Sequence, residues 1–196
     1  IGVDVTVVEY MPNIVPVEDE DVSKQLQRSF KKSGIKVMTN SSVEKVDVKN
    51  GSCEVMVKTK KGEETITADI VLSAVGITAN IEGIGLEEVG IKTENGKLVV
   101  DEFYNTNVPG YYAIGDLLPT QALAHVASAE GIVCVEKIAG ENPEPIDYGN
   151  IPGCTYCSPE IASVGMTETK AKEAGYDIKV GKFPFAASGR ALAVDQ

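Results

Sequence analysis

The sequence predicts an α/β fold in which short apolar strands alternate with helices. Three observations support this prediction. Apolar runs at 3–8 and 70–75 have the length of buried strands, and each is followed by an acid or a glycine. Segments with apolar residues at helical spacing lie between such runs. Three alternating stretches around Asn50-Gly51 and Lys61-Gly62 are typical of antiparallel hairpins.

Composition restricts the classes of partner. The 196 residues are 43% hydrophobic and carry a formal net charge of −11. This apolar content is enough for a buried core, and the negative charge argues against nucleic acid and anionic membrane surfaces as partners. No apolar run is long enough to cross a bilayer, and no signal peptide is visible. The four cysteines do not suit a secreted disulfide scaffold, so we expect reduced thiols and a cytoplasmic location.

The two ends of the sequence resemble cuts rather than termini. Ile1 lies within an α/β unit and is not a methionine, and Gln196 follows neither a helix end nor a turn. We therefore expect a piece of a longer protein.

The first predicted strand, residues 3–9, ends in Glu9. In a dinucleotide-binding fold, an acid at the end of the second strand accepts hydrogen bonds from the adenosine ribose and repels a 2′-phosphate, which favours NAD over NADP. The alternative is a surface acid after a strand. The Gly-x-Gly-x-x-Gly loop that would decide between them would lie before residue 1.

A helix is expected to begin at the acids of 18–21 and to end at Gly34. Val22, Leu26 and Phe30 give it an apolar stripe. Consecutive acids point in different directions around a helix, so we expect no metal site there. Further strands are expected at 35–38 and, in the meander, at 43–49, 53–60 and 63–67.

A strongly apolar strand is predicted at 69–75, and Gly76 follows it. Such a strand would return to the centre of the sheet, and a glycine at its end allows a nucleotide to approach the backbone closely. A short helical turn is expected within 84–91, and a strand-like segment at 97–106.

The segment from Tyr111 to His125 combines a short buried strand, a glycine, an acid and a helix start. Gly115 lets the backbone turn, and Asp116 can accept hydrogen bonds from hydroxyl groups. The N–H groups that begin the predicted helix, residues 121–140, would point back to the same place. This arrangement suits a ligand with sugar hydroxyls and an electron-accepting ring or a phosphate. The alternative is a turn whose aspartate caps backbone amides.

Tyr112-Ala-Ile-Gly-Asp116, followed by Leu123-Ala-His125 and Glu130-Gly-Ile132, closely resembles the second flavin motif of the pyridine nucleotide-disulfide oxidoreductases. The resemblance implies FAD and NAD as cofactors and places Asp116 on a ribityl hydroxyl of FAD. It implies cofactor contacts also for Glu9, Val43 beside the adenine, Gly76, Ala122, Leu123, Ala124 and His125.

The resemblance covers the whole chain and implies three parts. Residues 1–79 would be the C-terminal part of a Rossmann-like NAD-binding domain with a β-meander. Residues 80–147 would be part of an FAD-binding central domain, and 148–196 the start of an α+β interface domain. The segments 155–165 and 184–190 resemble that interface domain, which forms most of the homodimer contact in this family. Within it we expect a helix at 169–174, capped by Thr167, and a strand at 178–185.

Within the family, the resemblance is greatest to the branch that oxidises dihydrolipoamide with FAD and reduces NAD+. It implies a lipoyl-bearing partner from a 2-oxo acid dehydrogenase complex or the glycine cleavage system. Gly76-Ile-Thr-Ala-Asn80 departs from the usual Gly-Arg-x-Pro-Asn, which leaves the subgroup open. The alternatives are a sibling flavin disulfide or mercuric reductase, or a non-catalytic nucleotide-binding module.

Two features suggest chemistry that we do not assign. Cys154-Thr-Tyr-Cys157 has redox or zinc spacing, but it lies in a β-like stretch rather than at a helix start, and no second ligand pair accompanies it. The family's redox pair is a Cys-x4-Cys, which does not occur here. His125 is the single histidine, and its position suggests a backbone contact with the flavin rather than a general base. We therefore predict no catalytic residue, no metal site and no activity for these residues alone.

Overall fold

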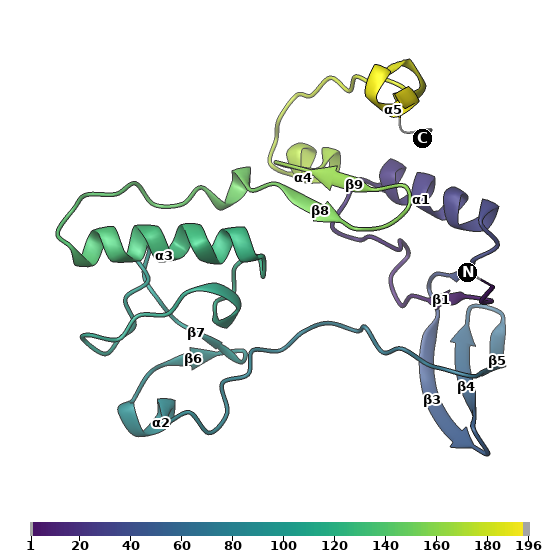
Figure 1. The fold of residues 1–196 in the computed structure, drawn as a ribbon, viewed down its shortest axis with the longest axis horizontal. Coiled ribbons are helices and arrows are strands. Elements are labelled where there is room, and N and C mark those ends of the chain that lie inside the picture. Colours follow the sequence, from purple (N-terminus) through teal and green to yellow (C-terminus); the bar gives the residue numbers. More distant parts are fainter. Residues whose placement is uncertain (1, 194–196) are drawn as a thin grey trace. The chain divides into compact units, whose positions relative to one another are not determined.

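The structure, a computed structural model, describes residues 2–193, which divide into two compact units. One unit holds the chain up to Ser73 and from Pro152 onward, and the other holds Ala74–Ile151. Both mix helices and strands, which confirms the predicted α/β class (Figure 1). The boundaries predicted at 79/80 and 147/148 stay a prediction.

In the first unit, a parallel strand pair is followed by the meander. Strand β1 (Thr6–Val8) pairs with β2 (Lys36–Met38), and helix α1 (Glu20–Lys32) connects them. Acids occupy the first turn of α1 and lysines its last, and Leu26 on its apolar stripe is buried. The strand–helix–strand unit therefore forms as its pattern predicts.

The predicted meander is a three-stranded antiparallel sheet in the order β3-β4-β5 (Figure 1). Asn50 and Gly51 both have positive φ, as a two-residue hairpin turn requires. On β4, Cys53, Val55 and Val57 form a buried cluster against which residues of β1, β2 and β5 pack. The strands are β3 (Ser42–Lys49), β4 (Ser52–Thr59) and β5 (Gly62–Ala68).

The C-terminal part of this unit contacts the start of α1. Thr167 caps helix α4 by accepting a hydrogen bond from the Lys170 N–H, as predicted. Asp19 accepts a hydrogen bond from the Glu168 N–H at 2.8 Å. The acids before and within α1 thus serve protein contacts. The elements here are β8 (Gly153–Thr155), β9 (Ile161–Ser163), α4 (Glu168–Glu173), a 3₁₀ turn η3 (Phe185–Ala187) and α5 (Gly189–Ala193).

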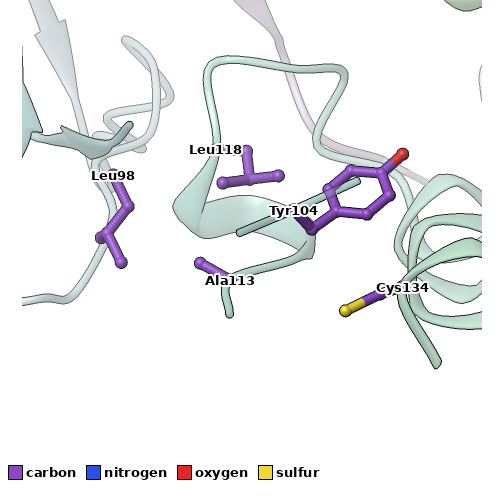
Figure 2. Packing of buried hydrophobic residues seen from close by; sticks show 5 residues of the cluster. All are labelled: Leu98, Tyr104, Ala113, Leu118 and Cys134. Atoms are coloured by element: carbon purple, nitrogen blue, oxygen red, sulfur yellow. The ribbon is translucent and has the colours of Figure 1, made fainter. Parts of the chain in front are cut away.

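The second unit is built around helix α3 (Ala124–Ile138). Its buried cluster joins Leu98 of β7 and Tyr104 to Ala113, Leu118 and Cys134, the last on α3 (Figure 2). No helix within 2–193 is long and apolar enough to cross a membrane. The other elements are α2 (Leu86–Val89), β6 (Thr93–Glu94), β7 (Lys97–Leu98), and the 3₁₀ turns η1 (Gly115–Leu117) and η2 (Tyr148–Asn150).

Three predicted strands are wrong. Residues 69–75 are extended but unpaired within the described chain, and Leu72 and Val75 are 87% and 95% exposed. Residues 112–114 contribute only one isolated bridge, Asn105 to Tyr112. Residues 178–185 contain no strand. The apolar pattern identifies segments suited to a sheet, but a strand forms only where another strand supplies hydrogen bonds.

Candidate functional site

Asp116 lies in the turn η1, shortly after the buried Ala113 and the extended residue Ile114. Gly115 adopts φ +72°, a conformation that side chains strongly disfavour, so this position suits glycine. The Lys97 ammonium donates a hydrogen bond to the backbone carbonyl of Asp116. The Asp116 side chain is exposed and has no hydrogen-bond partner within residues 2–193. Its carboxylate is therefore available to a ligand.

Helix α3 begins three residues later than predicted. Leu123 occupies the N-cap position, where it forms no side-chain capping bond, and Ala124 is the first helical residue. Ala122 and Leu123 are half-buried, whereas Ala124 and His125 are exposed. The start of a helix carries partial positive charge on its N–H groups. All four predicted contact residues thus lie at this helix start, a few residues after Asp116.

A buried carboxylate, Glu130, connects Asp116's turn to α3. Glu130 has no exposed surface, and its Oε2 accepts a hydrogen bond from the Gly115 N–H at 2.5 Å. Its Oε1 accepts bonds from the hydroxyls of Thr120 at 2.9 Å and Tyr148 at 2.7 Å. Three donors therefore satisfy a charge that burial would otherwise penalise. Glu130 belongs to the segment that resembles the flavin motif, but the sequence pattern predicted no role for it.

Two tyrosines extend this network. The hydroxyls of Tyr104 and Tyr148 lie 3.0 Å apart. Burial, followed by the hydrogen bonds to Tyr104 and Glu130, raises the pKa of Tyr148 far above its ordinary value. Burial, reinforced by the nearby charge of Glu130, also raises the pKa of Tyr104. Both side chains therefore stay protonated and serve as hydrogen-bond donors.

The turn and the helix are packed closely together. A Cβ added to Gly115 would lie 3.1 Å from the Ala127 Cβ, and one added to Gly131 would lie 3.2 Å from Ile114 Cδ1. At these distances a side chain at either glycine fits only if its neighbour shifts by a few tenths of an ångström. The available carboxylate of Asp116 and the helix start, fixed by this packing, fit a flavin that carries a polyhydroxyl chain and a ring.

The other unit brings Glu9 near the start of the strand that carries Val43. The Ser41 N–H donates to the Glu9 carbonyl at 3.0 Å, and Val43 follows two residues later. The Glu9 carboxylate accepts a hydrogen bond from the Met11 N–H at 2.7 Å. Val43 is exposed on β3. Glu9 thus fixes the chain after β1, and its carboxylate has further acceptor capacity for a ribose hydroxyl.

Gly76 lies in the second unit, in the extended segment after residue 75. It has φ +113°, and no atom lies within 4 Å of an added Cβ. The open space would allow a ligand to approach the backbone, but no hydrogen bond within residues 2–193 joins Gly76 to the other predicted site residues of its unit.

Cys154 and Cys157 are both free thiols. Cys154 belongs to β8, which confirms that the pair does not open a helix. Burial raises the pKa of Cys157, and its thiol donates to the Pro159 carbonyl at 3.0 Å. A raised pKa disfavours the reactive thiolate. Within the described residues, no three metal-ligating side chains gather in one place.

The sequence profile of the pyridine nucleotide-disulphide oxidoreductases matches residues 1–131, and the profile of their dimerisation domain matches 151–196. A dihydrolipoyl dehydrogenase of Rhizobium etli is 52% identical over 197 residues, which cover 100% of this chain and 41% of the relative. The chain thus spans well under half the length of the curated relatives it matches.

Two solved structures have a similar fold. LpdA of Mycobacterium tuberculosis matches with a TM-score of 0.88 and 29% identity, over 99% of this chain and 42% of that one. The HOCl-induced flavoprotein disulfide reductase RclA of Escherichia coli matches with a TM-score of 0.85 and 26% identity, over 99% of this chain and 44% of that one.

Proposed function

Because the chain belongs to the pyridine nucleotide-disulphide oxidoreductase family, we propose that it forms part of an FAD-dependent enzyme that oxidises dihydrolipoamide and reduces NAD+. The 52% identity to a relative named dihydrolipoyl dehydrogenase is the observation that supports this branch most strongly. We propose that the chain acts within a polypeptide of its relatives' length.

In this proposal, the chain's own residues hold the two cofactors. Asp116 accepts a hydrogen bond from the ribityl chain of FAD, and the helix start at Ala122–His125 lies along the flavin. Glu9 accepts a hydrogen bond from the adenosine ribose of NAD, and Val43 flanks the adenine. Gly76 allows close approach of NAD. The bound FAD supplies the two-electron redox chemistry between disulfide and nicotinamide.

The partners follow from the same proposal. Residues 151–196 match a dimerisation domain, which supports a homodimer. The lipoyl-bearing component of a 2-oxo acid dehydrogenase complex or of the glycine cleavage system would deliver the dihydrolipoyl group. A cytoplasmic location suits four cysteines that are all free thiols.

A sibling reductase for another disulfide is the second candidate, and the similarity to the E. coli flavoprotein disulfide reductase favours it. The two candidates are expected to use different nicotinamide cofactors, NAD+ in the dihydrolipoamide branch and NADPH in the sibling reductase. The acid at Glu9 repels a 2′-phosphate and so supports NAD+ over NADP+.

Steady-state assays test the proposal directly. The full-length enzyme should reduce NAD+ with dihydrolipoamide, and NADP+ should be a much poorer acceptor. Glu9→Gln should narrow the difference in steady-state rate between NAD+ and NADP+, whereas Glu44→Gln on β3 should leave that difference unchanged. NADPH-dependent reduction of a different disulfide would favour the sibling reductase. NADH formation by residues 1–196 alone would contradict the proposal that the chain acts only within a longer polypeptide.

A further inference from the structure

The geometry points to Glu130 as a positioning residue, whose buried carboxylate sets the turn that carries Asp116 in the arrangement that holds FAD. This inference rests on the proposed function and adds a residue outside the predicted contact set. Glu130 itself is fully buried and lies within α3, so it does not touch the cofactor. It acts through the backbone of Gly115.

The two carboxylate oxygens of Glu130 accept hydrogen bonds from different parts of the chain. Oε2 receives the N–H of Gly115, whose peptide leads directly into Asp116. Oε1 receives the hydroxyls of Thr120 and Tyr148, which lie on either side of α3 in the sequence. One oxygen therefore fixes the turn that carries the ligand-binding acid, and the other fixes the chain entering and leaving the helix.

No cation balances this carboxylate within residues 2–193, and its charge is satisfied entirely by donors. Burying a carboxylate costs desolvation free energy, so an apolar side chain packed at this position would join the turn to the helix at least as stably. A hydrogen bond to the Gly115 N–H, however, fixes the direction of the peptide, which apolar packing does not. Direction matters at Asp116 because its carboxylate must meet a hydroxyl within hydrogen-bond distance.

Variants separate the positioning role from stability. Glu130→Asp keeps the charge but withdraws it from Gly115 by one methylene, and Glu130→Met fills the volume without an acceptor. Both should weaken FAD binding by the full-length enzyme by at least about tenfold, the effect of losing one charge-assisted hydrogen bond. Glu130→Gln keeps an acceptor for Gly115 and should restore most of the affinity. FAD dissociation constants, measured by fluorescence well below the melting temperature, provide the readout.

Three controls make the result decisive. Thr120→Ala and Tyr148→Phe remove donors to Oε1 only, so they should lower the melting temperature but change FAD affinity by less than about threefold, since the Gly115 bond remains. Glu136→Gln, an exposed acid on α3, should change neither. If Glu130→Asp folds and binds FAD as tightly as the wild type, the positioning role is wrong.

The failure of the proposed function gives a different pattern. If Asp116→Ala also leaves the FAD dissociation constant unchanged, the cofactor does not bind at this turn. If Asp116→Ala weakens binding and Glu130→Asp does not, the proposed function stands and the inference about Glu130 falls. Equal losses of FAD affinity in Thr120→Ala and Glu130→Asp would show that the Gly115 bond has no special role, and the inference would fall.

Discussion

At the scale of single residues, the site depends on hydrogen bonds that keep backbone and side chains in fixed directions. Asp116 is exposed and available, whereas Glu130 is buried and fully satisfied. Tyr148 links the two halves of this arrangement because it donates to Glu130 and contacts the Tyr104 hydroxyl. This hydrogen bond requires the Tyr148 hydroxyl to be protonated.

Because Tyr148 must stay protonated to donate to Glu130, we predict that the stability of the fold falls at alkaline pH. Because the folded state raises the pKa of Tyr148, the stabilisation is complete below about pH 10, the unfolded value, and falls as pH rises above it. Tyr148→Phe should reduce the pH dependence of the unfolding free energy by up to about 1.4 kcal/mol per pH unit in this range. Urea unfolding followed by circular dichroism between pH 9 and 11 measures it.

The exposed Tyr176 provides the matched control, since Tyr176→Phe should leave the alkaline slope unchanged. Identical slopes for wild type and Tyr148→Phe would show that Tyr148 ionises as easily in the folded chain as in the unfolded one.

At the scale of elements, the contact between α3 and the turn η1 requires small residues. An added Cβ at Gly131 would lie 3.2 Å from Ile114 Cδ1, so a branched side chain requires the Ile114 side chain to move aside. Gly131→Val should therefore lower the unfolding free energy by about 1–3 kcal/mol, as overpacking does. Chemical denaturation measures the loss.

Ser128→Ala, on the exposed face of the same helix, should stay within about 0.5 kcal/mol of the wild type. A Gly131→Val variant as stable as the wild type would mean that the Ile114 side chain can move aside at no cost.

The elements that sequence analysis predicted correctly are those set by local pattern. The meander follows from alternation around Asn50-Gly51, and α1 from its charged ends and apolar stripe. The strand at 69–75 was predicted wrongly because pairing depends on a neighbour that the pattern cannot reveal. The role of Glu130 was missed because its donors lie 10–18 residues away, although an acid in a helix of small, apolar residues is a signal worth following.

At the scale of the whole molecule, the C-terminal part matches a dimerisation domain and exposes large apolar side chains. Phe183 and Phe185 are 73% and 78% exposed, and Tyr156 is 89% exposed. Exposed apolar groups of this size are typical of surfaces that another chain covers. The proposed homodimer would bury them.

Phe185→Asp should therefore shift the full-length enzyme from dimer to monomer, because burial of an unpaired charge opposes association. Sedimentation velocity measures the change. Lys179→Ala, an exposed residue of the same segment, should leave the dimer intact. A Phe185→Asp enzyme that remains fully dimeric would place the interface elsewhere.

In the proposed function, the Asp116 carboxylate, at the turn before α3, binds the ribityl chain of FAD. The most direct test is the FAD dissociation constant of the full-length Asp116→Ala enzyme, with Glu102→Gln as the exposed-acid control. Losing a hydrogen bond to a charged acceptor should raise the constant about 10–100-fold in Asp116→Ala and leave Glu102→Gln unchanged. Equal constants for wild type and Asp116→Ala would show that Asp116 does not bind FAD.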